Sequence, residues 1–465
     1  MADTHTTAGA ASSVRARAGV AVPLVFVAFA VTMTGLPAQL VSPFVRRDDW
    51  PFLLPRGTPG ANDPVDKVRQ EGRWVSYGWW WLIGQHGTPV TAVVVLFVAY
   101  AVFVVGLWRL FATGGVLPGA LLGAALMVSP VWVRLIYWPG TLSAAFVVAA
   151  VSVWVLPWAA GRRVRLVSWV VVVSVLAVLT YPPVGGVLVI AAAVHLRRRP
   201  WVDVILLCGT FVAGFAAGVV LAFVLNWTAF GHFGVAIAGW RHPNAPRTAH
   251  DLLVNGHRYA GQAIRLVAAL RWPAAVAAVA ALVALADPLV RPMWLRVAAG
   301  VAVVAGLECA QTLATGVRTD VRGSLWAWLA VVAPAGLLLL GSPWSRRLGL
   351  ACLAALTLLG AHAWHSNIAT HQDTRRSYDA VISSALQVSR GRPVVMYQSP
   401  HERASARGRI TAGTLRMMFY DQTGIVVRWC LPSECAGLAA LAPDGPVHDL
   451  GSVTGVVVPA PPATL

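Results

Sequence analysis

Runs of about 20 mostly apolar residues recur along this 465-residue chain, and each is long enough to cross the hydrocarbon core of a bilayer as a helix. Only 12% of the residues are charged, whereas roughly a quarter are charged in a soluble domain. The chain therefore cannot cover a water-facing surface of ordinary size, and the sequence predicts an all-α polytopic membrane protein. Eleven spans are expected, at residues 19–41, 89–110, 115–133, 140–159, 166–181, 184–196, 201–225, 263–286, 296–314, 324–342 and 347–364.

Arginine placement predicts which ends of these spans face the cytoplasm, because short cytoplasmic connections are enriched in Lys and Arg. With the N-terminus inside, the short inner connections carry eleven arginines and the short outer ones only Arg134, Arg318 and Arg322. We therefore expect a cytoplasmic tail over 1–18, a transmembrane region over 19–364 and a C-terminus outside. This topology accounts for much of the net charge of +18, so nucleic acid is not an expected partner.

One connection decides the side on which the C-terminus lies. Residues 166–196 are interrupted only by Tyr181-Pro182-Pro183. A single long helix there would place the C-terminus inside, whereas two short helices would place it outside. Proline lacks a backbone donor and disfavours the helical conformation of the residue before it, so a hairpin of two helices is the preferred interpretation.

Three polar segments, 42–88, 226–262 and 365–465, are then expected on the outer side. In the last of them, short β-rich runs at 393–397, 424–429 and 453–458 predict a small extracytoplasmic α/β domain. Cys430 and Cys435 lie in this domain, where disulfides can persist. A local disulfide is the preferred interpretation, and a metal-binding pair is the alternative. The domain should begin with an amphipathic helix over 373–389, whose apolar face is Tyr378, Val381, Ile382, Ala385 and Leu386.

Carboxylates are scarce, and five of the 18 lie in the first outer segment. Asp48 and Asp49 follow the first span almost directly, and carboxylates so close to hydrocarbon are costly unless they are paired or used. One interpretation is an interfacial ion cluster with Arg46 and Arg47. The other is a catalytic carboxylate that takes a proton from an acceptor hydroxyl, or that holds a divalent cation such as Mg²⁺ or Mn²⁺. No metal-ligand spacing is recognisable elsewhere in the sequence.

Other outer residues are candidates for substrate binding. Arg318 and Arg322 oppose the charge rule, so they are expected either to bind a lipid phosphate or to pair with Asp320. The first outer segment ends in Arg73-Trp74 and an aromatic run over 77–81, which could stack on sugar rings or form an interfacial helix. Glu308 is the one carboxylate well inside a late span and is either functional or held by a neighbouring helix. The histidines of 226–262 are read as part of a solvated or acceptor-facing loop.

In their order and sidedness, these motifs resemble integral-membrane glycosyltransferases of the GT-C superfamily, and most closely the GtrII-type O-antigen glucosyltransferases. The resemblance implies a polyprenyl-phosphate-linked sugar as donor and a surface glycan as acceptor, on the outer side of a bacterial inner (plasma) membrane. In such a reaction an Asp deprotonates the acceptor hydroxyl while arginine stabilises the departing lipid phosphate. The positions that carry the resemblance are Asp48 and Asp49 as catalytic carboxylates, and Arg73, Trp74, Tyr181, Arg318 and Arg322 as substrate-binding residues.

Two other classes of protein fit parts of the pattern. A transporter or flippase of a lipid-linked saccharide should show repeat symmetry and several deep charges, but only Glu308 is clearly deep. A non-catalytic membrane scaffold would use the outer tail to bind a partner, and the clustered acids of the first outer segment argue against it.

Overall fold

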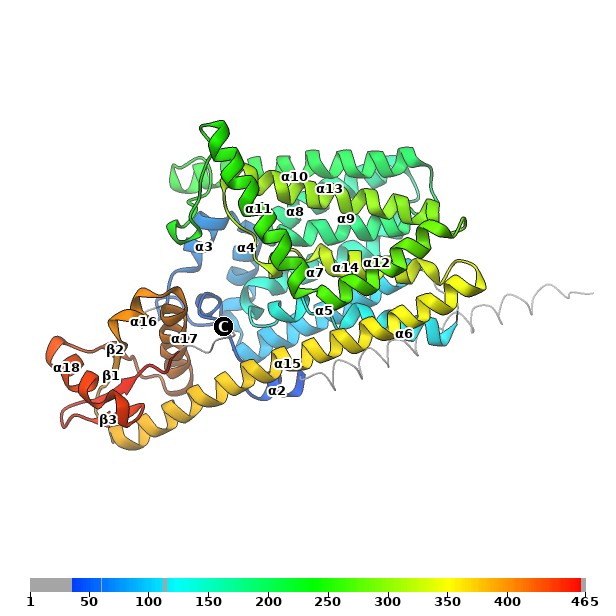
Figure 1. The fold of residues 1–465 in the computed structure, drawn as a ribbon. Coiled ribbons are helices and arrows are strands. Elements are labelled where there is room, and N and C mark those ends of the chain that lie inside the picture. The colour runs from blue at the N-terminus through cyan, green and yellow to red at the C-terminus, as the bar shows by residue number, and fades with distance from the viewer. Residues whose placement is uncertain (1–35, 60, 112–114, 461–465) are drawn as a thin grey trace, which may run out of the picture.

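The structure is a computed structural model that describes residues 36–59, 61–111 and 115–460, and Figure 1 shows it as a helical bundle with a small C-terminal sheet. The bundle contains α2 (Leu36–Val41), α3 (Pro64–Glu71), α4 (Trp74–Leu82), α5 (Pro89–Phe111), α6 (Val116–Met127), α7 (Pro139–Ala159), α8 (Arg163–Thr180), α9 (Pro183–His195), α10 (Trp201–Phe230), α11 (Ala249–Ala269), α12 (Arg271–Ala286), α13 (Arg291–Thr315), α14 (Trp326–Leu338) and α15 (Pro343–Ser389). The C-terminal part adds β1 (Val394–Tyr397), α16 (Pro400–Ala404), α17 (Ala406–Thr423), β2 (Arg428–Trp429), α18 (Pro432–Leu441), β3 (Val447–Asp449) and β4 (Thr454–Val457).

The long apolar helices indicate a multi-pass membrane protein. Among the described residues, six helices are long and apolar enough to cross a membrane, namely α5, α7, α8, α10, α13 and α15. Their outer faces expose apolar side chains such as Val98 on α5 and Ile205 on α10, which are 59% and 66% exposed. The count of eleven spans stays a prediction, because α6, α9 and α14 are shorter apolar helices. The first expected span, 19–41, lies outside the described residues apart from α2.

The expected span 263–286 is not one straight helix. The structure has α11 and α12 there, and they meet at an angle of 89°. Pro273 lies in the first turn of α12, where its missing N–H leaves no helical bond to break. Inside one continuous helix, residue 273 would have to donate a backbone hydrogen bond, which proline cannot do. The proline therefore favours a separate helix that begins at Arg271. The segment 226–262 is also less loop-like than expected, because α10 continues to Phe230 and α11 begins at Ala249.

The break at Tyr181 divides the chain into two antiparallel helices, as its prolines predict. The first turn of α8 lies beside the first turn of α10, since Arg163 Nε is 2.6 Å from Asp203 Oδ1. Further along, a Cβ on Gly214 would lie 3.1 Å from the Cβ of Ser174, so α8 and α10 run parallel. The intervening helix α9 must therefore return in the opposite direction.

Several arginines gather at one end of the bundle, the end opposite Tyr181. Arg197 donates to the backbone oxygen of Leu110 at 2.8 Å, and Arg296 donates to the backbone oxygen of Arg197 at 3.4 Å. Arg163 pairs with Asp203 at the same end. The short connections that the sequence assigns to the inner side therefore lie together.

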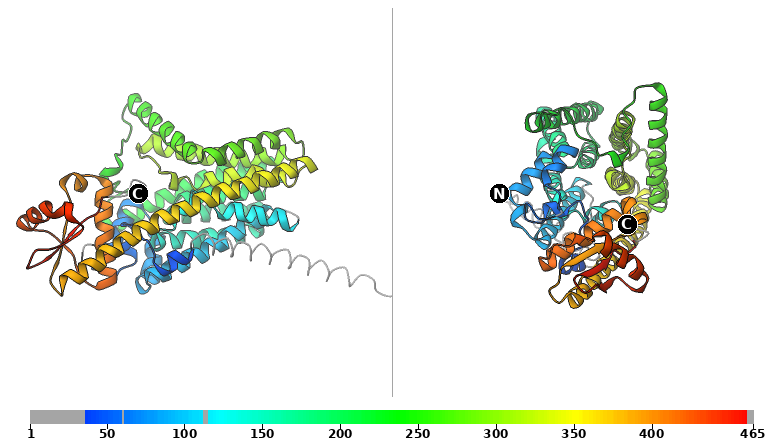
Figure 2. Two further views of the ribbon diagram at one scale, coloured as in Figure 1. Left: turned by 60° about the horizontal axis from the view of Figure 1, so that its bottom comes forward. Right: turned by 90° about the vertical axis from the view of Figure 1, so that its left-hand side faces the viewer.

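Helix α15 joins the bundle to the C-terminal part without a break (Figures 1 and 2). Its 47 residues correspond to about 70 Å of helix. The amphipathic helix expected over 373–389 is thus the end of α15, because nothing between the two apolar patterns stops a helix. Tyr378, Val381, Ile382 and Ala385 are buried as expected, but Leu386 is 39% exposed.

In the described residues, four strands form one sheet in the order β2-β1-β4-β3. β1 pairs in parallel with β2 and β4, and β3 is antiparallel to β4. The two faces of β1 alternate: Val394 and Met396 belong to the main core, and Val395 packs with Leu438 of α18. Strand β3 and helices α16, α17 and α18 were not expected from the sequence.

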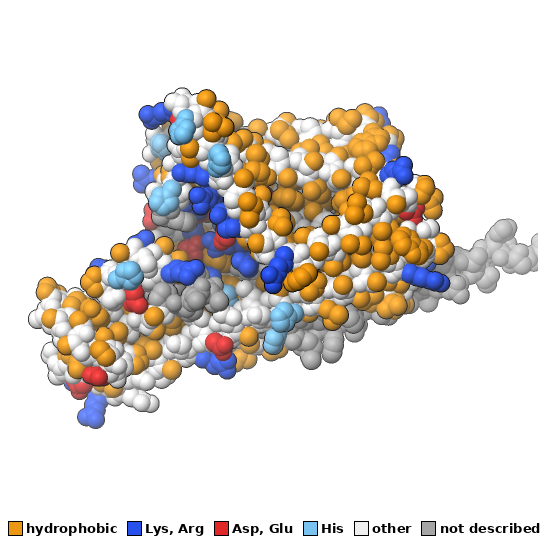
Figure 3. All heavy atoms as spheres, in the orientation of Figure 1, with side chains coloured by type: hydrophobic (Ala, Val, Ile, Leu, Met, Phe, Trp, Pro, Cys, Tyr) orange, Lys and Arg blue, Asp and Glu red, His pale blue; other side chains and the backbone are white. Residues whose placement is uncertain are grey.

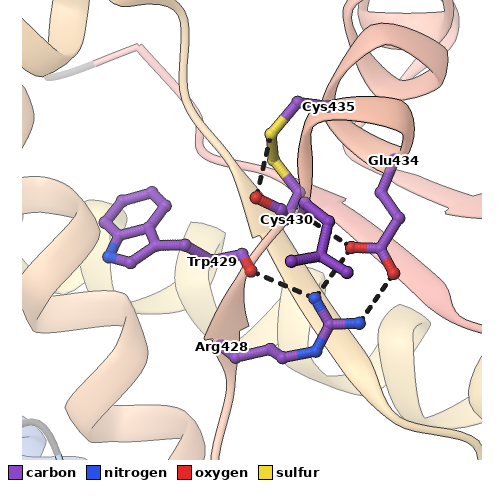
Figure 4. The surroundings of a disulfide bond; sticks show 6 residues. Arg428, Trp429, Cys430, Glu434 and Cys435 are labelled. Atoms are coloured by element: carbon purple, nitrogen blue, oxygen red, sulfur yellow. Dashed lines mark hydrogen bonds and ion pairs between the residues drawn. A yellow bond between two sulfur atoms is a disulfide. The ribbon is translucent and has the colours of Figure 1, made fainter.

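Cys430 and Cys435 form a disulfide (Figure 4), which is the interpretation that the sequence favoured over a metal-binding pair. It ties the end of β2 to the first turns of α18. Arg428 bonds both carboxylate oxygens of Glu434 at 2.6 and 2.7 Å, so an ion pair crosses the same junction. The two links tie α18 to the edge strand β2, while Leu438 of the helix packs against Val395 of β1 and Gly455 of β4.

Candidate functional site

A cavity of about 850 Å³ lies at the bundle end away from the arginine-rich connections. Its deeper part is apolar and is formed by α8, α10 and α13, with Val178, Phe211, Phe215, Val219, Phe223 and Leu307. Its other part is lined by five arginines: Arg73, Arg241, Arg258, Arg318 and Arg322. Such a cavity can hold an apolar chain at one end and an anionic group at the other, because guanidinium groups suit phosphate oxygens.

Glu71 lies at the rim of the cavity and is surrounded by cations. Its side chain is 8% exposed, and Arg73 lies 2.7 Å away, Lys67 lies 3.7 Å away and Arg241 forms a third ion pair. Burial raises the pKa of Glu71, but the three cations outweigh it and lower the pKa to about 2. Glu71 therefore stays ionised and holds Arg73 and Arg241 in place.

The glycine between Glu71 and Arg73 is required by the backbone. Gly72 has a φ of +69° and ends α3, a left-handed conformation that favours glycine. A Cβ there would also lie 3.1 Å from Ala222 of α10. Gly72 thus turns the chain so that Arg73 faces the cavity.

Four of the residues singled out in the sequence meet at this cavity. The Arg73 guanidinium lies 4.9 Å from the centre of the Tyr181 ring, and the Tyr181 hydroxyl donates to the backbone oxygen of Arg322 at 3.3 Å. Arg318 lines the same cavity. Arg322 also forms the expected ion pair with Asp320, at 3.4 Å. The residues come from the connection between α3 and α4, the α8–α9 break and the segment after α13, so only the fold brings them together.

Glu308 positions the segment that carries Arg318 and Arg322. It accepts hydrogen bonds from Ser324 at 2.7 Å and Trp326 at 2.6 Å, and also from the side-chain amide of Gln262. The oxygen of Gln262 in turn accepts from the backbone N–H of Thr319. The carboxylate is therefore held by neighbouring elements, which was one of the two expectations for it.

The side chain of Asp48 is 46% exposed, beside the cationic end of the cavity. It accepts from Lys67 at 2.9 Å and from the indole N–H of Trp138 at 2.6 Å. The guanidinium of Arg322 lies 4.2 Å from the Trp138 ring, and that of Arg46 lies 5.3 Å from it. Burial raises the pKa of Asp48, but Lys67 and Arg322 lower it by more, so the pKa lies well below its usual range.

Trp138 is a part of the site that sequence reasoning missed. It lies in the short connection before α7, between Asp48 and two arginines. The sequence offers only a weak signal, which is the position of Tyr137-Trp138-Pro139 between two expected spans.

Asp49 points away from Asp48 and into the protein. It is fully buried, and its carboxylate accepts from the backbone N–H of Gly140 and of Thr141 at 2.7 Å each, and from the Thr141 hydroxyl. These donors form the first turn of α7, where a negative charge is favourable. Burial raises the pKa of Asp49 to about 7, although the three donors oppose the rise. The geometry gives Asp49 a positioning role: it fixes the start of α7 beside Trp138.

The carboxylates of Asp48 and Asp49 have different partners, Lys67 and Trp138 for Asp48 and the start of α7 for Asp49. In the part of the chain that the structure describes, no group of three His, Cys, Asp or Glu side chains could hold a metal ion. Asp48 is also close to Lys67 and Arg322, and these cations disfavour a divalent cation at the carboxylate. A divalent cation such as Mg²⁺ or Mn²⁺ at these carboxylates stays a prediction.

Trp74 lies apart from the lining of the cavity. Its indole donates to Asn226 at 2.9 Å, and its ring stacks on Phe230 at 5.8 Å between centroids. In the same helix Trp80 is buried and Trp81 is 57% exposed. The aromatic run is thus distributed around α4, which fits an interfacial helix better than a sugar-stacking surface.

Charged side chains gather where the C-terminal part meets the bundle. In Figure 3, Lys and Arg side chains line a hollow between the C-terminal part and the region of α3 and α11, with acidic side chains among them.

Comparison with known proteins finds no relative. No family model matches the chain, no curated protein matches it, and no solved structure matches it. The case for a function therefore rests on the chain's own residues.

Proposed function

We propose that the chain is an integral-membrane glycosyltransferase that transfers a sugar from a polyprenyl-phosphate donor to a surface glycan. The observation that carries this proposal is the cavity, which has an apolar end, five arginines at its other end and a solvent-accessible carboxylate beside them. An isoprenoid chain matches the apolar end, a phosphate matches the arginines, and a sugar hydroxyl can reach Asp48.

In the proposed reaction, the acceptor hydroxyl attacks the anomeric carbon of the donor sugar. A bond forms between the acceptor oxygen and this carbon, and the bond from this carbon to the phosphate oxygen breaks. Arg318 and Arg322, with Arg73, would stabilise the phosphate as it departs. Asp48 would take the hydroxyl proton. The hydroxyl becomes acidic as its new bond forms, so a carboxylate of low pKa can accept the proton late in the step.

Tyr181, Trp138 and Asp49 would act through these groups. Tyr181 orients the backbone at Arg322, Trp138 orients Asp48, and Asp49 fixes the helix start next to Trp138. We regard the three as positioning residues.

We also propose eleven spans in a bacterial inner membrane, with the N-terminus inside and the C-terminal part outside. The arginine-rich connections lie at the end of the bundle opposite the cavity, as expected if that end is cytoplasmic. A membrane-impermeant thiol reagent should then label Cys430 or Cys435 in intact cells after reduction. Labelling that occurs only in broken cells would reverse the orientation.

The test of the function is lipid mass spectrometry together with analysis of the surface glycan. Cells would lack the chain or carry wild type, Asp48→Asn or Arg376→Gln, the last as a control at an exposed arginine of α15. We expect the deletion and Asp48→Asn to accumulate a polyprenyl-phosphate sugar and to lose one glycan residue. Wild type and Arg376→Gln should restore both.

The same experiment separates the competing functions. Rescue by Asp48→Asn would fit a scaffold. A deletion that leaves lipids and glycan unchanged would remove the proposal altogether. A flippase would be indicated if isolated membranes from the deletion still transferred the sugar when the donor was supplied on the outer side.

A further inference from the structure

The basic surface next to Asp48 is built from Arg47, Arg403, Arg409 and Arg416, on the first outer segment and on α16 and α17. Arg47 lies across α17 and donates to the backbone oxygen of Arg409 at 3.0 Å. A Cβ on Gly413 would fall 2.4 Å from the Cδ of Arg47, so glycine is needed for this close approach. Arg409 in turn donates to the backbone oxygen of Arg403 at 3.3 Å.

Negative charge on the protein does not balance this surface. In the described part of the chain, no ion pair joins any of its four arginines to a carboxylate. The Nε of Arg416 is buried and has no hydrogen-bond partner. Arg403 lies over the Trp429 ring at 4.7 Å. Partial burial, Arg409 and Arg416 lower the pKa of Arg47, because like charges repel, and Asp48 opposes part of this shift.

Arg47, Arg403 and Arg409 are exposed, so the positive potential of this cluster is open to a ligand of opposite charge. The phosphate of the proposed donor would be held by the cavity arginines, which face Asp48 from the bundle. The basic surface faces Asp48 from the C-terminal part. It is thus placed for the second substrate.

From this arrangement we infer that the acceptor is an acidic glycan, bearing carboxylates or phosphodiesters, and that the basic surface binds it next to Asp48. This inference rests on the proposed function, because it names the acceptor class of the same site. Arginine forks bind both anionic groups, and the Trp429 ring beside Arg403 offers an apolar face to a sugar.

Anionic lipid head groups are the competing ligand. The glycan is favoured because Arg403, Arg409 and Arg416 lie on α16 and α17, and α17 is bonded to the polar end of α15, where Gln422 donates to Asp379 at 2.7 Å, rather than to its apolar part. Arg47 also links this surface to Asp48, because it bonds α17 while the charge of Asp48, the next residue along the chain, acts on its guanidinium.

The test measures binding to the purified full chain in nanodiscs of uncharged phosphatidylcholine. The ligands are fluorescent oligogalacturonate, a glycerol-phosphate polymer and, as the neutral control, dextran of similar length. The variants are Arg409→Gln/Arg416→Gln, Arg416→Gln alone, and a matched pair, Arg265→Gln/Arg376→Gln, at exposed arginines elsewhere. The Arg409 side chain bonds backbone oxygens of α16, so its loss could also change the structure of that helix. Arg416→Gln alone removes a charge from the surface without breaking these bonds.

We expect both acidic ligands to bind wild type, with weaker binding at higher salt. Arg416→Gln should weaken binding by about tenfold, which is the effect of one lost charge-assisted contact, and the double variant should weaken it further. The matched pair should not change it. Equal binding of dextran, or equal losses in the matched pair, would overturn the inference. The inference would also be overturned if neither acidic glycan bound and phosphatidylglycerol stabilised wild type but not the double variant, because the surface would then bind anionic lipid.

Asp48→Asn separates this inference from the proposed function. It should bind acidic glycans as wild type does, while transfer is lost. If no condition supports sugar transfer but acidic glycans still bind through the basic surface, the function fails and the binding site stands. If wild type and Arg409→Gln/Arg416→Gln transfer sugar at the same rate to an acidic and to a neutral acceptor, the function stands and the inference fails.

Discussion

The neighbouring aspartates should respond in opposite ways to the same substitution. Asp49→Asn should destabilise the protein, and Asp48→Asn should abolish activity with little change in stability. The reason is geometric: Asp49 is fully buried at the start of α7, whereas the Asp48 side chain is 46% exposed. A substitution of oxygen by an amide nitrogen is nearly isosteric, so any difference reports charge and hydrogen bonding.

The size of each effect follows from the contacts. Asn at position 49 keeps one oxygen for the Thr141 donors, but its NH₂ group then faces the N–H of Gly140, 2.7 Å from the oxygen that it replaces. One bond to a charged group is lost and a buried donor is left unpaired, at a cost of about 2–3 kcal/mol. Spread over a chain of this size, that lowers Tm by roughly 3 °C. Asn at position 48 loses an accessible ion pair with Lys67, which is worth about 1 kcal/mol or less.

The assay is thermal unfolding in detergent at about pH 5 and about pH 8, with sugar transfer measured on the same preparations. Because burial raises the pKa of Asp49 to about 7, the cost of the buried charge offsets part of the loss at pH 8, so Asp49→Asn should lower Tm more at pH 5 than at pH 8. Asp48→Asn should reduce transfer by about 10²–10⁴-fold, the range typical of a lost general base. Asp49→Ser and Asp48→Ser extend the comparison to a shorter side chain. The reasoning would be refuted if Asp49→Asn unfolded at the wild-type temperature, or if Asp48→Asn kept full transfer activity.

Three further predictions concern the cavity rim and the C-terminal part. Arg318→Ala should raise the KM for the lipid-linked donor more than the KM for the acceptor, and equal changes would indicate a structural role instead. Glu71→Gln should lower stability by at most about 3 kcal/mol near neutral pH, because the pKa of Glu71 falls from 4.5 to about 2 on folding. That contribution is complete above the unfolded pKa and is lost as pH falls toward 2, so the difference in Tm from wild type should shrink in acid. Cys430→Ser should weaken the C-terminal part by about 2 kcal/mol, seen as faster hydrogen exchange in α18, whereas Cys309→Ser should leave α18 unchanged.

Local signals were enough to predict much of the architecture. The apolar runs give the long helices, and the prolines after Tyr181 give the α8–α9 break, because both effects act within a few residues. The pairing of Cys430 with Cys435 is equally local. Strand β3 was missed because its three residues, Val447–Asp449, pair only with β4 and carry no alternating pattern of their own.

The site was only partly predictable, because its geometry depends on distant contacts. The sequence singled out Asp48 and Asp49 together, but which one faces solvent depends on Gly140 and Thr141, 91 and 92 residues away. The basic surface could not be foreseen for the same reason, since Arg47 meets the backbone of Arg409 across 362 residues. Periodicity shows which face of a helix is apolar, but it does not show which helix will cover that face.

The unbroken course of α15 has a consequence for how the C-terminal part can be varied. Its 47 residues form one rod, so the rotational phase of the sheet and α17 is set by the number of residues in that rod. Each residue inserted between 365 and 377 would turn everything beyond it by about 100° and move it outward by about 1.5 Å. A single insertion would therefore carry α17 away from Arg47, whereas seven would bring it back to within about 20° of its original bearing but roughly 10 Å farther out. The length of α15 thus fixes both the distance of the C-terminal part from the helical bundle and the direction in which it faces.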